Sequence, residues 1–192
     1  VRLPSATGLI EDLVIQIENG LITDVSPAAQ HAAPSPGDLD GQGWIVCPGW
    51  IDIQINGAFG LDFSSDPASI WEVAAKLPRF GVSGFLPTVI TSADYTYSRA
   101  ISVLKQGPPS GWRGARPFGW NFEGPFLNPA RKGAHNPDFL RSPDLSFIQD
   151  WSRENGVLLV TMAPELRGAT EISARLAASG VVLSAGHTAA TF

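Results

Sequence analysis

The chain has 192 residues, and its 13 Lys and Arg against 18 Asp and Glu give a formal net charge of −5. This acidic balance argues against a nucleic-acid-binding protein, which typically carries a basic patch. Charged residues are 16% and hydrophobic residues 44%, so the composition predicts a folded chain, and no uncharged apolar stretch approaches the ~18 residues of a membrane helix. We therefore expect neither a nucleic acid nor a membrane as partner.

The first elements predicted along the chain are two short β-strands, at residues 13–18 and 21–26. They flank Asn19-Gly20, and this dipeptide between alternating apolar residues is the strongest short-range signal of a β-hairpin. Residues 27–43 are rich in Pro, Gly and Ala without a regular pattern, which predicts a loop. The single cysteine, Cys47, cannot form an internal disulfide, and we therefore expect a cytoplasmic protein.

Beyond residue 44 the pattern alternates between strands and helices. The predicted strands are 50–55, 84–90, 117–122, 157–162 and 181–185, and the predicted helices are 66–80, 92–106, 144–155 and 169–179. Such an alternation indicates an α/β fold with about five βα units and parallel strands. It fits either a doubly wound sheet or part of a (β/α)8 barrel.

The first of these strands favours the barrel. Between residues 51 and 56, isoleucines alternate with Asp52, Gln54 and Asn56, which places the isoleucines on one face and the polar residues on the other. A strand covered by helices on both faces is apolar throughout, whereas a polar row suits the inner face of a barrel near its mouth. A complete barrel needs ~250 residues, so we predict an incomplete (β/α)8 barrel.

Two residues at strand ends are candidate metal ligands, Glu123 and His187. Catalytic groups of barrel enzymes lie at the carboxyl ends of the strands. Taken singly, each residue can have a purely structural role. Glu123 can cap a loop or form an ion pair, and His187 can pack at the rim of the barrel. Taken together, a carboxylate oxygen and an imidazole nitrogen suit one Zn²⁺, which needs at least one further protein ligand. We expect their nearest oxygen and nitrogen to lie about 3–4 Å apart, since each ligand bonds zinc at about 2.0–2.2 Å.

Two further polar residues lie near the same end of the predicted barrel. His135 follows Glu123 by twelve residues in a loop, and it belongs either to the site or to a surface loop. Glu165 lies just after the strand at 157–162 and close to Arg167, which favours an ion pair at the rim over a catalytic role.

Several segments in order resemble N-acetylglucosamine-6-phosphate deacetylases, which are members of the amidohydrolase superfamily. They are PGWIDIQING at 48–57, LPT at 86–88, FEGPFLN at 122–128, KGAHNP at 132–137, VTMAPE at 160–165 and SAGHT at 184–188. The resemblance implies metal-dependent hydrolysis of N-acetylglucosamine 6-phosphate to glucosamine 6-phosphate and acetate. It also implies that residues 1–47 are the amino-terminal part of a small β-sandwich domain and 48–192 the first five βα units of the barrel.

The same resemblance assigns roles to individual residues. Glu123 and His187 match metal ligands, and Ala134 and His135 match a dipeptide that contacts substrate. Gln54 and Asn56 stand where many related barrels carry a His-x-His pair, which implies that these two residues form pocket wall and that each subunit binds one divalent metal. Zn²⁺ is expected, with Fe, Co and Mn as alternatives.

The resemblance places the remaining machinery beyond Phe192. A third histidine ligand, the general-base Asp and a phosphate-binding Arg belong to later motifs, so we expect no catalytic residue in this chain and no activity from the 192 residues alone. A homodimer is expected for the full-length protein. The alternatives are a deacetylase of another N-acetyl sugar phosphate, such as N-acetylgalactosamine 6-phosphate, a cyclic-amide hydrolase, and a non-catalytic barrel fragment.

Overall fold

The first compact unit, Val1–Pro48, is built of β-hairpins. A computed structural model describes residues 1–191 of the chain. The elements of this unit are β1 (Leu3–Ser5), β2 (Gly8–Ile10), β3 (Leu13–Glu18), β4 (Leu21–Pro27) and the 3-10 turn η1 (Ala28–Gln30). The predicted hairpin is confirmed as the antiparallel pair β3–β4. Asn19 and Gly20 at its turn have φ of 53° and 77°, the left-handed values that a two-residue hairpin turn of this kind requires. The hairpin β1–β2 was not predicted.

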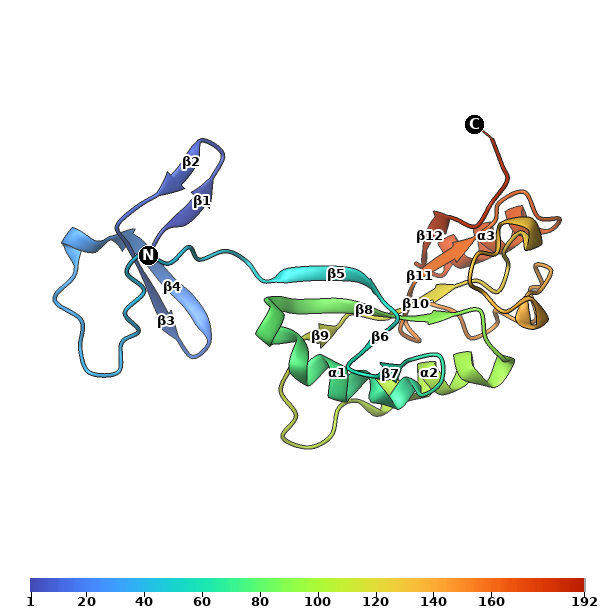
Figure 1. Ribbon diagram of the computed structural model, residues 1–192, viewed down its shortest axis with the longest axis horizontal. Helices are drawn as coiled ribbons and strands as arrows, with labels where there is room; N and C mark the ends of the chain where they lie inside the picture. The colour runs from blue at the N-terminus through green and yellow to red at the C-terminus, as the bar shows by residue number, and fades with distance from the viewer. Residues whose placement is uncertain (192) are drawn as a thin grey trace. The chain divides into compact units, whose positions relative to one another are not determined.

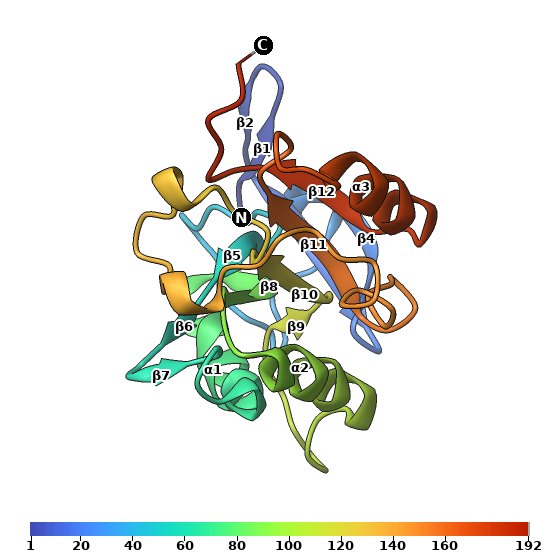
Figure 2. The ribbon, with the colours of Figure 1, turned by 90° about the vertical axis from the view of Figure 1, so that its right-hand side faces the viewer.

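The second unit, from Gly49 onward, contains a curled parallel sheet (Figures 1 and 2). Its main strands are β5 (Trp50–Ile55), β8 (Val82–Ile90), β10 (Trp120–Glu123), β11 (Val157–Met162) and β12 (Val182–Ala185). They lie side by side in the order in which they occur in the chain, and all of these pairs are parallel. A doubly wound sheet reverses its strand order at a switch point, so this order is instead consistent with part of a (β/α)8 barrel.

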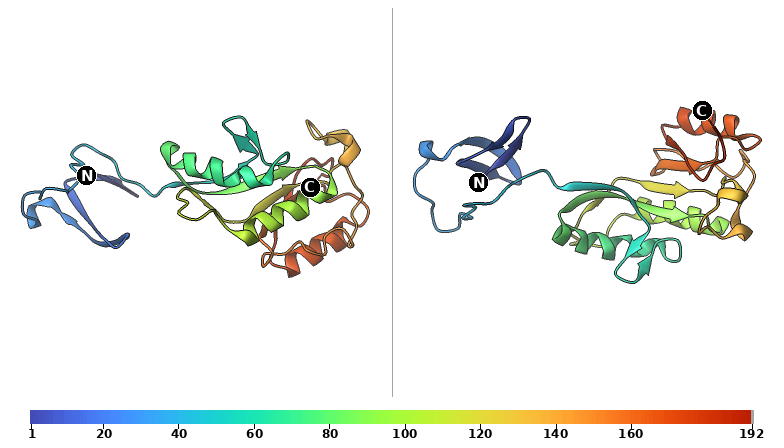
Figure 3. Two further views of the ribbon diagram at one scale, coloured as in Figure 1. Left: turned by 90° about the horizontal axis from the view of Figure 1, so that it is seen from below. Right: turned by 45° about the horizontal axis from the view of Figure 1, so that its top comes forward.

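Helices follow most of these strands and pack against one face of the sheet (Figures 2 and 3). They are α1 (Ile70–Lys76), α2 (Asp94–Gln106) and α3 (Ala169–Ala178), with the 3-10 turns η2 (Pro67–Ser69), η3 (Leu77–Phe80), η4 (Pro129–Arg131) and η5 (Pro137–Phe139). The short strands β6 (Gly57–Ala58), β7 (Leu61–Asp62) and β9 (Arg116–Pro117) lie in the connections. None of the helices in residues 1–191 is long and apolar enough to cross a membrane.

The hydrophobic core lies between the sheet and these helices and is rich in aromatic side chains. Trp120 and Phe122 of β10 are fully buried, and Tyr97 of α2 and Trp151 pack on Phe122 with ring centroids 5.0 and 4.7 Å away. The indole N–H of Trp120 donates to the carbonyl oxygen of Ala100 in α2 at 2.7 Å. This hydrogen bond and the ring contacts fix α2 against the strand that ends in Glu123.

The helix predicted at residues 144–155 is wrong, because the structure has no helix there. Residues 144–155 form successive turns, in which backbone bonds such as Phe147 N–H to Asp144 C=O span three residues. The carboxylate of Asp144 accepts hydrogen bonds from the amide and hydroxyl of Ser146, and the Ser152 hydroxyl accepts the Asn155 amide. Such local side-chain bonds compete with helical hydrogen bonding, and the sequence pattern does not reveal which will win.

The predicted alternation along β5 is also wrong in part. Asp52 pairs with Phe85 of β8 whereas Ile55 pairs with Pro87, so three residue steps of β5 lie opposite two of β8. This bulge lies between Asp52 and Ile55 and reverses the faces of the strand before Ile55. Ile53 lines a hollow on the sheet, while Ile55 packs against the core, so the isoleucines do not share one face.

Candidate metal centre

Glu123, the last residue of β10, is the centre of the site. Its side chain is only 12% exposed. Gln54 of β5 donates from Nε2 to one carboxylate oxygen, Oε2, at 2.9 Å. The next residue, Gly124, has φ of 91°, and a side chain there would collide with the Thr91 hydroxyl. The glycine therefore allows the chain to turn sharply while the carboxylate stays at the strand end.

His187 follows β12 and reaches the same carboxylate. Its Nε2 lies 2.9 Å from Glu123 Oε1. Its Nδ1 lies 3.0 Å from the backbone carbonyl oxygen of Arg131, which can only accept a hydrogen bond, so Nδ1 carries a proton. In neutral His187 the free electron pair is therefore on Nε2 and faces Glu123. Metal-binding histidines typically donate their other N–H to a carbonyl or carboxylate in this way.

His135 lies in the loop between η4 and η5, buried beside His187, with their ring centroids 4.5 Å apart. Its Nδ1 accepts the backbone N–H of Thr91 at 3.3 Å and lies 2.8 Å from the Thr91 hydroxyl. An amide can only donate, so the proton of neutral His135 is on Nε2, which lies 3.8 Å from Glu123 Oε1. The two histidines thus present opposite groups to the carboxylate, a free electron pair from His187 and an N–H from His135.

Together the three side chains form a cluster that can hold a cation. One ligand atom each from Glu123, His135 and His187 lies within 4.8 Å of the others. His135, whose Nε2–H faces the carboxylate, is the main cause that holds the pKa of Glu123 below its ordinary value; burial opposes this effect, and His187 adds to it only when its Nε2 carries a proton. A carboxylate facing the electron pair of His187 at 2.9 Å requires a proton or a metal ion between them. The donor set therefore fits a divalent metal.

The structure brings together most of the residues singled out from the sequence. Glu123 and His187 meet as expected, and Gln54 contacts Glu123. Ala134 is exposed next to His135, and Asn56 is exposed one residue beyond β5, with its backbone carbonyl accepting the Phe63 amide. Thr91, which orients His135, was missed because nothing in its local sequence reveals a contact to a residue 44 positions away.

The predicted ion pair between Glu165 and Arg167 is not what the structure shows. Glu165 accepts hydrogen bonds from the Thr188 hydroxyl, the Ala189 amide at 2.7 Å and the Asn128 side-chain amide at 2.8 Å. Thr188 is the largest cause, followed by Ala189 and Asn128, that lowers the pKa of Glu165 to about 2. Thr188 and Ala189 lie on the segment that follows His187, 23 and 24 residues after Glu165. Tertiary structure therefore decides which groups Glu165 binds, and its sequence neighbours do not reveal them.

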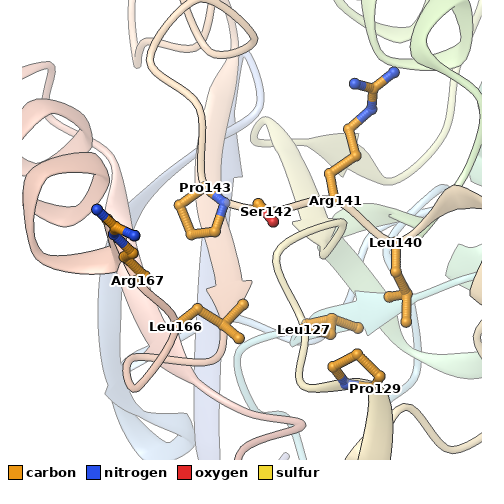
Figure 4. Close-up of a pocket in the computed structure, with 9 residues that line it drawn as sticks. Leu127, Pro129, Leu140, Arg141, Ser142, Pro143, Leu166 and Arg167 are labelled. Atoms are coloured by element: carbon orange, nitrogen blue, oxygen red, sulfur yellow. The ribbon is translucent and has the colours of Figure 1, made fainter.

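A separate cavity of about 500 Å³ lies between the loops that follow β10 and β11 (Figure 4). Leu127, Leu166, Arg141 and Arg167 are among the residues that line it. Arg141 also pairs with Asp94 at the start of α2. None of the three clustered residues lines this cavity, so it is distinct from the candidate metal centre.

Comparisons with known proteins identify the relatives of this chain. It is 36% identical over 190 residues to the N-acetylglucosamine-6-phosphate deacetylase of Caenorhabditis elegans, which covers 92% of this chain and 45% of that protein. The predicted resemblance is confirmed. The chain is also 29% identical over 194 residues to the N-acetylgalactosamine-6-phosphate deacetylase of Escherichia coli O157:H7, covering 100% of this chain and 50% of that one. No family model matches the chain.

A solved structure gives the same relationship. The deacetylase of Mycobacterium smegmatis, as a variant in complex with N-acetyl-D-glucosamine-6-phosphate, superposes with a TM-score of 0.76 at 28% identity, covering 99% of this chain and 49% of that one. The chain thus spans half or less of the length of each relative named here. The predicted link to deacetylases, a class of amidohydrolase enzymes, therefore holds over the part of these relatives that the chain covers.

Proposed function

We propose that this chain is part of a metal-dependent deacetylase of an N-acetyl amino sugar phosphate, with N-acetylglucosamine 6-phosphate as substrate. The reaction adds water across the acetamide C–N bond and releases acetate and glucosamine 6-phosphate. The observation that carries the proposal is the contact between His187 Nε2 and Glu123 Oε1, at the ends of two parallel strands. The similarity to deacetylases across nearly the whole chain supports it.

In this proposal Glu123 and His187 hold one divalent metal, with Zn²⁺ expected. The metal would polarise the acetamide carbonyl and lower the pKa of bound water. Gln54 fixes the orientation of the carboxylate through its 2.9 Å hydrogen bond, and the Arg131 carbonyl fixes the ring of His187. The residues that form the rest of the metal coordination, and the carboxylate that moves the proton, are not assigned to this chain.

His135 has a different role in the proposal. Its Nε2–H is a donor, and a donor contacts an oxygen of the substrate rather than a metal. Thr91 holds the ring by its backbone amide and hydroxyl, so the N–H stays directed into the site. Ala134 and Asn56 form pocket wall beside it.

The proposal extends to the architecture. Residues 48–192 would form five βα units of a (β/α)8 barrel, and residues 1–47 part of a small β-sandwich domain. The sequential parallel strand order supports the first assignment, and the resemblance alone supports the second. A homodimer and a cytoplasmic location stay predictions.

Acetate release tests the proposed function. The protein, purified in the full form that its gene encodes, is stripped of metal and incubated with N-acetylglucosamine 6-phosphate with and without Zn²⁺. Zinc-dependent release of acetate is expected, and Glu123→Gln should abolish it, whereas Glu171→Gln, a control at an exposed position of α3, should not. Faster release from N-acetylgalactosamine 6-phosphate would favour the activity of the E. coli relative. Absence of release from either substrate would contradict the proposal.

A further inference from the structure

His187 is held in an unfavourable backbone conformation. Its φ of 50° lies in the left-handed region, which is unfavourable for a residue other than glycine. Such a conformation persists only where neighbouring groups impose it. One of these groups is Asn128, whose backbone N–H donates to the His187 carbonyl oxygen at 3.0 Å.

The segment just after His187 is anchored by a single carboxylate, that of Glu165. Its Oε1 accepts the Ala189 amide at 2.7 Å, and its Oε2 accepts the Thr188 hydroxyl. Thr188 Oγ1 in turn accepts the Ala190 amide at 2.9 Å. Glu165 thus fixes the two residues that follow His187. Together with the hydrogen bond from the Asn128 amide to the His187 carbonyl, it limits the backbone movement open to the histidine.

The same carboxylate joins the two loops around the metal centre. The side-chain amide of Asn128 donates to Glu165 Oε1 at 2.8 Å, and Asn128 lies in the segment that leads to Arg131. Arg131 supplies the carbonyl that accepts His187 Nδ1–H. Glu165 therefore links the segment that follows His187 to the segment that orients the His187 ring.

We propose that Glu165 is a positioning residue that holds His187 with its Nε2 directed at Glu123. This inference rests on the proposed function, because it takes that nitrogen as a metal ligand. In this inference Glu165 acts through Thr188, Ala189 and Asn128, which donate to its carboxylate, rather than on the substrate.

The geometry predicts different results for two substitutions. Glu165→Ala removes all three hydrogen bonds. Glu165→Gln retains an oxygen that can accept from Ala189 and Asn128, and its amide can donate to Thr188 Oγ1, so it preserves the contacts without the charge. Glu171→Ala on α3 removes an equal charge elsewhere on the surface and is the control. Thr188→Val removes the hydroxyl that donates to Glu165 and accepts the Ala190 amide, but it leaves the hydrogen bonds from Ala189 and Asn128 to Glu165 in place, so it serves if the alanine variant does not fold.

Two measurements on the protein in the full form that its gene encodes test the inference. The first is Zn²⁺ affinity by calorimetric titration, where Glu165→Ala should weaken binding by about 10–100-fold, the usual effect of removing a group that orients a ligand. The second needs no metal and is hydrogen exchange of the amides of Ala189 and Ala190. In Glu165→Ala the Ala189 amide loses its acceptor and should exchange faster, and the Ala190 amide should follow as the segment loosens. In Thr188→Val the Ala190 amide should exchange faster, because it loses the hydroxyl that accepts it, whereas the Ala189 amide keeps its bond to Glu165 and should change less. Glu165→Gln and Glu171→Ala should stay near the parental values in both measurements.

Parental zinc affinity together with parental exchange in Glu165→Ala would overturn the inference. Equal losses of zinc affinity and of amide protection in Glu165→Gln and Glu165→Ala would also overturn the inference. The charge of Glu165, and not its hydrogen bonds, would then be what matters. If the parental protein binds no zinc, the proposed function fails, and the exchange comparison alone decides whether Glu165 fixes the segment.

Discussion

Replacing Gly186 with alanine tests how tightly the end of β12 is fitted against β11. Gly186 lies between β12 and His187, and its amide donates to the Met162 carbonyl at 3.1 Å. A Cβ added at Gly186 would lie 2.5 Å from Cγ2 of Thr161 on the neighbouring strand. The change therefore introduces one methyl group at the point where the chain leaves the sheet for the metal centre.

The size of the effect follows from that distance. Two carbon atoms pack best at about 3.5–4.0 Å, so the added methyl would overlap Thr161 by about 1 Å or more. Thr161 is β-branched and restricted at χ1, and its backbone carbonyl accepts the Gly124 amide at 2.9 Å, so it does not move away easily. Inserting a methyl into such a site costs about 1–3 kcal/mol. A shift of β12 would also move His187 away from Glu123 and weaken metal binding.

Urea denaturation and zinc titration measure the two consequences. Gly186→Ala should lower the free energy of unfolding by about 1–3 kcal/mol and raise the zinc dissociation constant. Thr161→Ser removes Cγ2, so the double variant should recover most of both losses, and the double-mutant cycle should report a favourable coupling. If the two substitutions are instead additive, the close contact at Gly186 is not the cause and the reasoning is refuted.

Three further predictions concern the site and its support. His187→Ala should remove bound zinc, whereas His135→Ala should keep it and lower kcat/KM; loss of zinc from the second variant would contradict the assignment of His135 to substrate. Trp120→Phe should destabilise the protein by about 1–3 kcal/mol in urea denaturation, because it removes the indole hydrogen bond to the Ala100 carbonyl and leaves part of the space of a fully buried ring unfilled; an unchanged midpoint would contradict this. Because folding lowers the pKa of Glu165 from 4.5 to about 2, its charge stabilises the fold above pH 4.5, and this contribution is lost as the pH falls toward 2. The difference in unfolding free energy between the parental protein and Glu165→Ala should therefore shrink over that window, and a constant difference would count against it.

The sequence predicts the regular elements of this protein better than its irregular ones. The strands at 50–55 and 157–162 have the predicted bounds, because an alternating apolar pattern or a short apolar run that begins after a glycine indicates a strand locally. The absence of a helix at 144–155 and the bulge in β5 depend on side-chain hydrogen bonds and strand register, which no local pattern contains.

The candidate site could likewise be predicted only in part. Glu123 and His187 were predicted to meet because parallel strands end at one edge of a sheet, and this follows from the alternation of elements. The tautomers of the two histidines could not be predicted, since they depend on Thr91 and the Arg131 carbonyl, far away in the chain. The partners of Glu165 were wrongly predicted because its neighbour Arg167 is close in sequence but the donors are on other loops.

The central claim is that Glu123 and His187 bind one metal and that His135 does not. A crystal structure of the zinc-loaded protein, with anomalous data at the zinc absorption edge, tests this most directly. The account predicts a single peak about 2.0–2.2 Å from a Glu123 oxygen and from His187 Nε2, with His135 Nε2 beyond bonding distance. A peak bonded to His135 but not to His187, or no peak between these strand ends, would contradict it.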